Sequence, residues 1–181
     1  MCGFQLNTGI CDTMTEYRKA SPDDLERIWE MNINDNLGDP RWIAWREEAI
    51  SNNLCGMSRT FVVVSDGVPV GEGTLIFSPL CSAIDGRREL ADDASAANIN
   101  ALRIRREYEG QGHISALVRL MEFYAAQRGF TRLTIGVEAK ETRNLAIYLH
   151  WGYNKFITAE VEDGELVLYY EKDLTPEDVP E

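Results

Sequence analysis

The chain of 181 residues has few positive charges: 18 lysines and arginines stand against 30 aspartates and glutamates, and the formal net charge is −12. Nucleic acids and anionic lipid surfaces attract proteins through clusters of lysine and arginine. We therefore expect neither a nucleic-acid partner nor a membrane partner. The negative net charge agrees better with a cationic substrate such as an amine. Soluble enzymes are also often acidic for solubility alone.

The sequence is poor in metal ligands. Its two histidines, His113 and His150, lie far from all four cysteines, and no two cysteines are spaced as C-x-x-C. Because protein zinc sites use closely spaced ligands, we expect no metal. We interpret the cysteines as reduced thiols of a cytoplasmic protein.

Long apolar runs are also missing. No stretch approaches the roughly 18 apolar residues of a membrane span, and no basic segment followed by an apolar run opens the chain. The length suits a single domain. We expect residues 1–13 to be a poorly ordered N-terminal extension and residues 14–181 to form one soluble domain, located in the cytoplasm.

The first elements are predicted from capping signals. A short strand over residues 16–19 precedes a helix in which Ser21 is the cap, Pro22 is the first residue and Asp24 completes a capping box. A second helix is predicted to begin in the same way at residues 39–40, with an aspartate followed by a proline. It carries two tryptophans, which we interpret as packing residues, and it lies where a substrate-specificity element could sit.

A hairpin follows these helices. Asp66-Gly67 between two β-branched runs predicts strands over residues 60–65 and 68–77. Glycines flank Glu72 inside the returning strand, which indicates a bulge or a close approach by another chain or ligand. Residues 79–97 have no period and are expected to form a solvated connection, with a functional flap as the alternative.

The second half of the chain alternates strands with helices. The hydrophobic spacing predicts a core-facing helix from Ile114 to its stop at Arg128-Gly129. The remaining predictions are strands over residues 99–104 and 133–137, a helix over 142–150, and strands over 153–161 and 165–171.

A glycine turn joins one of these strands to the long helix. Gly110 and Gly112 lack a Cβ, so the backbone can bring its amides close to an anion, and the helix adds the positive end of its dipole. These features predict a diphosphate site, although such turns also occur without a ligand. Ser115 adds a hydroxyl, and Arg105 and Arg106 add local positive charge.

A dinucleotide-binding turn is the competing interpretation. It requires G-x-G-x-x-G and an acidic residue about 20 positions later. This pattern is partly matched by Gly110, Gly112, Ser115 and Glu138, but the third glycine is missing. The unit also lies too late in the chain to leave room for a second half, so we reject this interpretation.

The stretch EYEGQGHISALVRLMEFYAAQRGFTRLTIGVEAKETRNLAIYLHWGY, residues 107–153, resembles the acetyl-CoA-binding core of the GNAT family of N-acetyltransferases. That core typically reads E-Y-R-G-x-G-I-G-x-x-L-L, a helix ending in R-G, a strand, and A-x-x-Y-x-x-x-G-F. The order of elements outside the core also fits. The resemblance implies an α/β fold with a central mixed sheet of six to seven strands flanked by about four helices.

The resemblance also implies acetyl-CoA as co-substrate and assigns residues to it. Leu102 and Ile104 match strand positions whose backbone binds pantetheine, beside a splay between the two central strands. Tyr148 matches the general acid that protonates the departing thiolate. The loop whose amides hold the diphosphate falls on Glu109, Gly110, Gln111, Gly112, His113 and Ile114.

Three positions depart from the family pattern. Glu109 replaces an arginine or glutamine, and Ile114 replaces a glycine or alanine. A carboxylate beside phosphates is unfavourable unless it turns away or pairs with Arg105 or Arg106, so we expect weakened or rearranged binding. Glu141 stands where many members have an asparagine, and Asn144, one turn later, is the expected substitute.

The acceptor amine must lose a proton before it attacks, so a base or a water relay is needed. Glu72 is the first candidate and Glu138 the second; family members also use an ordered water. For each glutamate the alternative is a surface or hydrogen-bonding carboxylate. His113 is expected in the phosphate loop and His150 at a helix end, neither as the base.

These observations predict an N-acetyltransferase that passes acetyl directly to a primary amine in a ternary complex. No cysteine lies in the core motifs, which favours direct attack over an acyl-enzyme. The alternatives are a non-catalytic acyl-CoA-binding or sensor domain of the same fold, favoured by Glu109 and Ile114, and a protein-interaction module. The sequence leaves the acceptor open between small molecule and peptide, and the family resemblance makes a homodimer one option.

Overall fold

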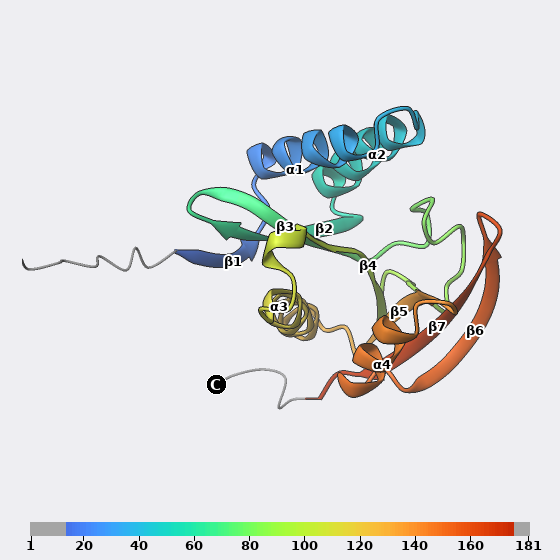
Figure 1. The fold of residues 1–181 in the computed structure, drawn as a ribbon. Helices are drawn as coiled ribbons and strands as arrows, with labels where there is room; N and C mark the ends of the chain where they lie inside the picture. The colour runs from blue at the N-terminus through green and yellow to red at the C-terminus, as the bar shows by residue number, and fades with distance from the viewer. Residues whose placement is uncertain (1–13, 176–181) are drawn as a thin grey trace, which may run out of the picture.

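The structure, a computed structural model, describes residues 14–175, so the expected extension over residues 1–13 lies outside the described residues. Seven strands form one mixed sheet in the order β1-β2-β3-β4-β5-β7-β6, as the predicted fold class requires. Figure 1 shows α1 and α2 on one side of this sheet and α3 and α4 on the other. The elements are β1 (Thr15–Lys19), α1 (Pro22–Asp35), α2 (Arg41–Cys55), β2 (Ser58–Ser65), β3 (Val68–Ile76), β4 (Ala96–Ile104), η1 (Arg106–Tyr108), α3 (His113–Gln127), β5 (Arg132–Glu138), α4 (Thr142–His150), β6 (Lys155–Glu162) and β7 (Glu165–Asp173).

The capping box at the start of α1 is confirmed. The Ser21 hydroxyl accepts a hydrogen bond from the Asp24 amide at 3.2 Å, and the Ser21 amide donates to the Asp24 carboxylate at 2.8 Å. Arg18 on β1 pairs with the same buried carboxylate, which ties the first strand to the first helix. The start of α2 differs from the prediction, because Pro40 is the cap residue and the carboxylate of Asp39 accepts the Arg41 amide at 3.0 Å.

The predicted core face of α3 packs on the sheet. Its buried apolar residues join strand residues in the main core cluster, together with the fully buried Tyr153. Trp151 is partly buried against that cluster. The helical apolar face expected for this region is therefore confirmed. The helix residues are Leu117, Val118, Met121 and Ala125.

The two glycines beside Glu72 allow close packing within the chain. A Cβ on Gly71 would lie 2.5 Å from the Ile104 side chain, and a Cβ on Gly73 would lie 2.8 Å from that of Leu102. The close approach expected from the sequence is therefore made by β4 and α3 of this same chain.

A bulge also lies here, but the extra residue belongs to β4. Glu72 faces Arg103 and Thr74 faces Asn100, so two residues of β4 lie opposite the single residue between them. One of the two, Ala101, has a φ of 54°. A left-handed residue at a bulge bends and twists its strand.

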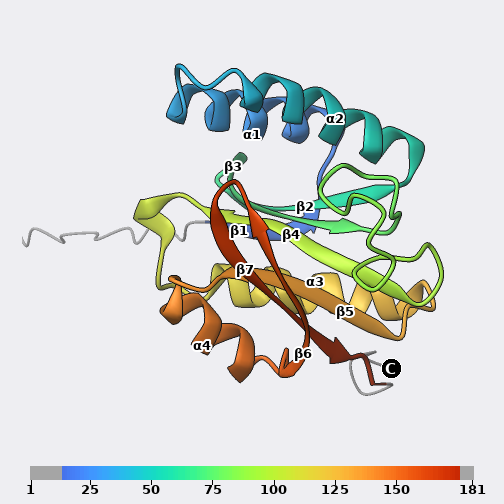
Figure 2. The same cartoon turned by 90° about the vertical axis from the view of Figure 1, so that its right-hand side faces the viewer.

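This bend coincides with the point where the central strands separate. β4 pairs with β5 in parallel only from Ala96 to Ile99. Beyond this point β4 continues to Ile104 and β5 continues to Glu138 without pairing to each other. Figure 2 shows the two strands close together at one end and apart at the other, toward η1 and α4.

The expectation of a solvated connection over residues 79–97 is wrong. Cys81, Ile84 and Leu90 are buried in a second apolar cluster with Ile76 and Tyr169. These apolar residues are irregularly spaced and therefore produce no periodic signal. The loop between β3 and β4, which carries Cys81, Ile84 and Leu90, lies on the side of the sheet where α1 and α2 lie (Figure 2).

Within residues 14–175, no helix combines the length and the apolar character needed to cross a bilayer. In the same described part of the chain, no group of three or more histidine, cysteine, aspartate or glutamate side chains is arranged to hold a metal ion.

Candidate active site

The glycine turn lies between η1 and α3. Gly110 and Gly112 have φ values of 73° and 82°, in the left-handed region that favours glycine. A Cβ at either position would meet nothing within 4 Å, so the backbone conformation and not crowding requires the glycines. Gly112 is the N-cap of α3 and has no side chain of its own to cap the helix. The cap residue therefore leaves the first-turn amides of this 15-residue helix available to an anion.

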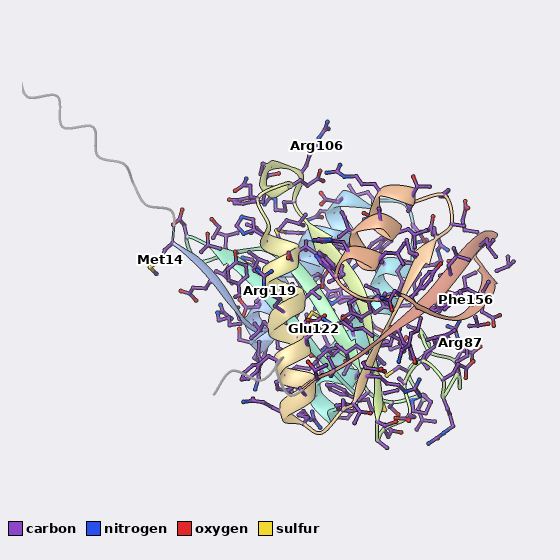
Figure 3. All side chains as sticks on the ribbon, turned by 90° about the horizontal axis from the view of Figure 1, so that it is seen from below. Met14, Arg87, Arg106, Arg119, Glu122 and Phe156 are labelled. Atoms are coloured by element: carbon purple, nitrogen blue, oxygen red, sulfur yellow. The ribbon has the colours of Figure 1, made fainter. Side chains whose placement is uncertain are left out.

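Side chains around the turn are held by local hydrogen bonds. The Nδ1 atom of His113 lies 2.8 Å from the Tyr17 hydroxyl on β1, and Nε2 lies 3.3 Å from the Gln111 side chain. The Ser115 hydroxyl accepts a hydrogen bond from Arg119 at 3.1 Å. Arg119, which the sequence analysis did not single out, thus brings a positive charge to the first turns of α3 (Figure 3).

The arginines expected beside the turn are placed differently. Arg105 pairs with Glu107 at 3.0 Å, and not with Glu109. Arg106 points away from the body of the protein (Figure 3). Glu109 is exposed, so its carboxylate can turn toward water and away from an anion held by the amides.

Four predicted cofactor or catalytic residues lie at the margin of the main core. Leu102 and Ile104 from β4, Ile114 from α3 and Tyr148 from α4 are all partly buried against the same cluster. Three different elements thus contribute to this margin of the core. Asn144, one turn before Tyr148 on α4, is exposed.

Tyr148 lies in an environment that favours its protonated form. Burial raises the pKa of its hydroxyl, and the nearby carboxylate of Glu141 raises it further. Its ring packs at 5.7 Å from that of Trp151. A tyrosine in this state can act as a proton donor at neutral pH.

Glu72 lies on the opposite face of the sheet. Its side chain is 1% exposed, and one oxygen accepts hydrogen bonds from Asn32 at 2.7 Å and Arg103 at 2.8 Å. The Arg103 guanidinium in turn lies over the rings of Trp42 at 5.0 Å and Trp29 at 5.9 Å. The carboxylate is thus held between α1 and β4 at one position.

The second base candidate has different surroundings. Glu138, at the end of β5, forms an ion pair with Lys140 at 3.1 Å, and its side chain is 43% exposed. Lys140 also pairs with Glu165. Glu138 thus belongs to an exposed charge network and lacks the fixed placement of Glu72.

A cavity of about 380 Å³ lies on the face of the sheet that Glu72 occupies. It is bounded by α2, the central strands β3 and β4, the loop after β3 and the β6–β7 turn, which rises toward α1 and α2 in Figure 2. The β4 bulge forms part of its wall. The lining residues are Trp29, Trp45, Glu48, Ala49, Asn52, Ser58, Thr74, Ile76, Cys81, Ser82, Ala83, Asn100, Ala101, Arg103, Glu162 and Asp163.

Contacts between distant segments close the sides of this cavity. The Glu48 carboxylate on α2 accepts hydrogen bonds from the Ser82 amide at 2.9 Å and hydroxyl at 2.6 Å. Arg41 at the start of α2 pairs with Asp163 in the β6–β7 turn at 3.4 Å. Burial alone would raise the pKa of Glu48, but the hydrogen bonds from Ser82 outweigh it and the pKa is lowered.

Sequence analysis did not find this cavity. Its walls come from residues near 48, 82, 101 and 163, and no local pattern connects them. The two tryptophans of α2 were the available signal. Trp42 does pack, as expected, at 6.2 Å from Trp29 and 5.3 Å from Trp45, but Trp45 also lines the cavity.

Comparison with solved structures shows the same fold in N-acetyltransferases. The protein is similar to an N-acetyltransferase from Staphylococcus aureus Mu50, with a TM-score of 0.66, 16% identity, and coverage of 90% of this chain and 99% of that chain. It is also similar to the PaiA N-acetyltransferase from Thermoplasma acidophilum in complex with coenzyme A, with a TM-score of 0.59, 17% identity, and coverage of 88% and 99%. At these identities the likeness concerns the fold.

Comparison of the sequence itself identifies the family. A search of curated proteins found no match. The sequence model of the acetyltransferase (GNAT) family matches residues 13–153, which is more than half of the chain. The glycine turn, both separated strands and Tyr148 all lie within that match. The chain therefore belongs to the acetyltransferase (GNAT) family.

Proposed function

We propose that the protein is an acetyl-CoA-dependent N-acetyltransferase that passes acetyl directly to a primary amine in a ternary complex. The observation that carries this proposal is the separation of β4 from β5 after Ile99. This opening begins beside the β4 bulge, whose residues Asn100 and Ala101 line the cavity. A thioester held there would face an acceptor in the cavity.

In this proposal the cofactor binds along β4 and α3. The backbones of Leu102 and Ile104 would hold the pantetheine arm, and Asn144 would add a contact from α4. The amides of residues 109–114 and the Ser115 hydroxyl would hold the diphosphate. Arg119, already bonded to Ser115, would add positive charge nearby.

The chemical step needs one proton removed and one supplied. The neutral amine nitrogen attacks the thioester carbonyl carbon, and the tetrahedral intermediate collapses with loss of the coenzyme A thiolate. Tyr148 gives its proton to that thiolate. The amine proton leaves to Glu72, directly or through a water, with Glu138 as the second candidate.

Glu72 is favoured over Glu138 by its surroundings. It is fixed by Asn32 and Arg103, and Arg103 lines the cavity. The exposed Glu138 pairs with Lys140 instead. A base must lie in a defined position relative to the proton that it removes, and Glu72 meets that condition better.

A non-catalytic acyl-CoA-binding or sensor domain is the second candidate. The exposed Glu109 beside the glycine turn and Ile114 in the first turn of α3 support it, because both depart from the family pattern. This candidate predicts that coenzyme A binds and that no amine releases its thiol.

An amine-library screen for thiol release from acetyl-CoA, with calorimetry of coenzyme A binding in parallel, separates these functions. The acetyltransferase predicts binding and thiol release with a subset of amines. Binding without release from any amine would support the sensor, and absence of binding would contradict both.

We place the reaction in the cytoplasm because the cysteines, of which Cys55 and Cys81 are free, show no disulfide pattern.

A further inference from the structure

The cavity is partly open to solvent and has a size that suits a small molecule. The Glu48–Ser82 hydrogen bonds join α2 to the loop after β3, and the Arg41–Asp163 ion pair joins α2 to the β6–β7 turn. Its volume of about 380 Å³ falls in the range of small-molecule sites, roughly 300–1,000 Å³.

The charged lining favours a cation. Three carboxylates, one from α2 and two from the end of β6 and its turn, contribute to the wall, against the single cation of Arg103. Arg103 is already paired with Glu72 and lies over Trp29 and Trp42. An incoming anion would therefore meet mostly negative charge. The three carboxylates are Glu48, Glu162 and Asp163.

Of these three, Glu48 is the one without a cationic partner. Glu162 pairs with Arg87, and Asp163 pairs with Arg41. Within residues 14–175, Glu48 receives hydrogen bonds only from neutral groups, those of Ser82 and Asn52. Its half-buried carboxylate thus presents a charge to the cavity that no ion pair offsets.

The remaining walls suit an aliphatic chain with a positive end. Trp29 and Trp45 contribute aromatic surface, which packs against methylene groups and attracts cations. Asn100 and Ala101 place the β4 bulge in the same cavity as Glu48. An amine nitrogen at the bulge and a second cation at Glu48 can therefore occupy one continuous space.

We infer that the acceptor is a small aliphatic amine that carries a second positive charge. The amine to be acetylated lies at the β4 bulge, the chain lies against the tryptophans, and the distal cation binds the Glu48 carboxylate. This inference rests on the proposed function, because it takes the β4 bulge as the place of acetyl transfer.

Three acceptors of equal length test the inference: diaminopentane, aminopentane and aminopentanoate, whose distal ends are positive, neutral and negative. We expect kcat/KM for thiol release to be about tenfold higher for the diamine than for the monoamine, because a charge-assisted contact contributes about that much. The value should be lowest for the amino acid, whose distal end is negative. Equal values for the diamine and the monoamine would overturn the inference while leaving the acetyltransferase function in place.

A matched pair of variants locates the distal cation. Glu48→Gln keeps an oxygen for Ser82 but loses the charge, so it should lower kcat/KM about tenfold for diaminopentane and leave aminopentane unchanged. Glu47→Gln, exposed on the same helix and outside the cavity lining, should change neither. An equal loss for both amines in Glu48→Gln would contradict the role of Glu48.

Direct binding keeps this test independent of turnover. Calorimetry of the unmodified protein should show tighter binding of diaminopentane than of aminopentane, and Glu48→Gln should remove the difference. If no amine releases thiol, the proposed function fails and the acceptor role fails with it; the binding difference then shows only whether the cavity binds a second positive charge through Glu48. If thiol is released, absence of the binding difference would overturn the inference.

Discussion

The carboxylate of Glu72 and the guanidinium of Arg103 form an ion pair of 2.8 Å between facing residues of β3 and β4, directly beside the β4 bulge. Glu72 is 1% exposed, whereas Arg103 is 37% exposed and lines the cavity. The pair thus fixes a buried carboxylate behind Arg103, which lines the proposed acceptor site.

Glu72→Gln should lower kcat/KM about 100-fold at neutral pH, because the variant has no carboxylate to take the amine proton. The coenzyme A affinity of the variant should stay within about twofold of the wild-type value. Glu72 lies on the face of the sheet opposite α3, along which the cofactor is proposed to bind. Glu30→Gln, exposed on α1, is the control. An unchanged kcat/KM in Glu72→Gln would remove the base assignment and direct the same test to Glu138.

Tyr148→Phe should lower kcat about 100-fold, the scale of general acid catalysis, and leave the affinity for acetyl-CoA unchanged. Because its pKa is raised, Tyr148 stays protonated throughout the neutral range, so wild-type kcat should decline only under strongly alkaline conditions and the variant should lack this decline. Tyr170→Phe on β7 serves as the control. Steady-state kinetics from pH 7 to 10.5 measure both effects, and equal turnover by Tyr148→Phe and wild type would exclude Tyr148 as the acid.

Gly112→Ala tests the glycine turn. An alanine at a φ of 82° is strained by about 1 kcal/mol, and shifting the turn would misplace the amides that are proposed to hold the diphosphate. We expect calorimetry to show coenzyme A binding weakened at least about tenfold. Gly86→Ala, at a φ of 78° and equally free of neighbours within 4 Å, should cost similar stability and leave binding unchanged. Equal binding by both variants would argue against the turn as the diphosphate site.

Asp24 should make the protein less stable in acid. Burial favours its neutral form, but hydrogen bonds from Arg18 and Ser21 prevail and lower its pKa from 3.8 to about 2. A lowered folded pKa means that the stabilisation, about 2 kcal/mol, is complete above pH 3.8 and is lost as the pH falls toward 2.

Asp24→Asn should therefore cost about 2 kcal/mol at pH 7, and the difference from wild type should shrink as the pH falls below 4. Urea unfolding at pH 7, 5, 4 and 3 measures this dependence. Asp23→Asn, exposed in the same turn, should change stability by only a few tenths of a kcal/mol. A cost for Asp24→Asn that is the same at every pH would show that charge is not its source.

Local signals predicted most of the fold. Two of these signals are the capping box of Ser21 and Asp24 and the Asp66-Gly67 turn. Each depends on residues only a few positions apart, so it can be predicted from the sequence, and the structure confirms both. The spacing of apolar residues located α3 in the same way. The apolar cluster over residues 79–97 was missed because its members have no period and bury one another only after the sheet has formed.

The same distinction between local and long-range signals applies to the candidate site. The glycine turn and Tyr148 lie in one continuous motif and could be identified before the structure was known. The Glu72–Arg103 pair depends on a strand register with an extra residue at Ala101, and the Glu48–Ser82 contact joins segments 34 residues apart. Register and long-range contacts follow from tertiary packing, which the local sequence does not encode.

The most direct test of the account follows free thiol and N-acetylated amine together in one reaction of the unmodified protein with acetyl-CoA and the best amine of the screen. Direct transfer predicts that the two products appear at equal rates and in equal amounts, and that intact-protein mass spectrometry finds no acetyl-enzyme. Thiol release without acetylated amine, or an acetylated protein that forms when the amine is withheld, would contradict it.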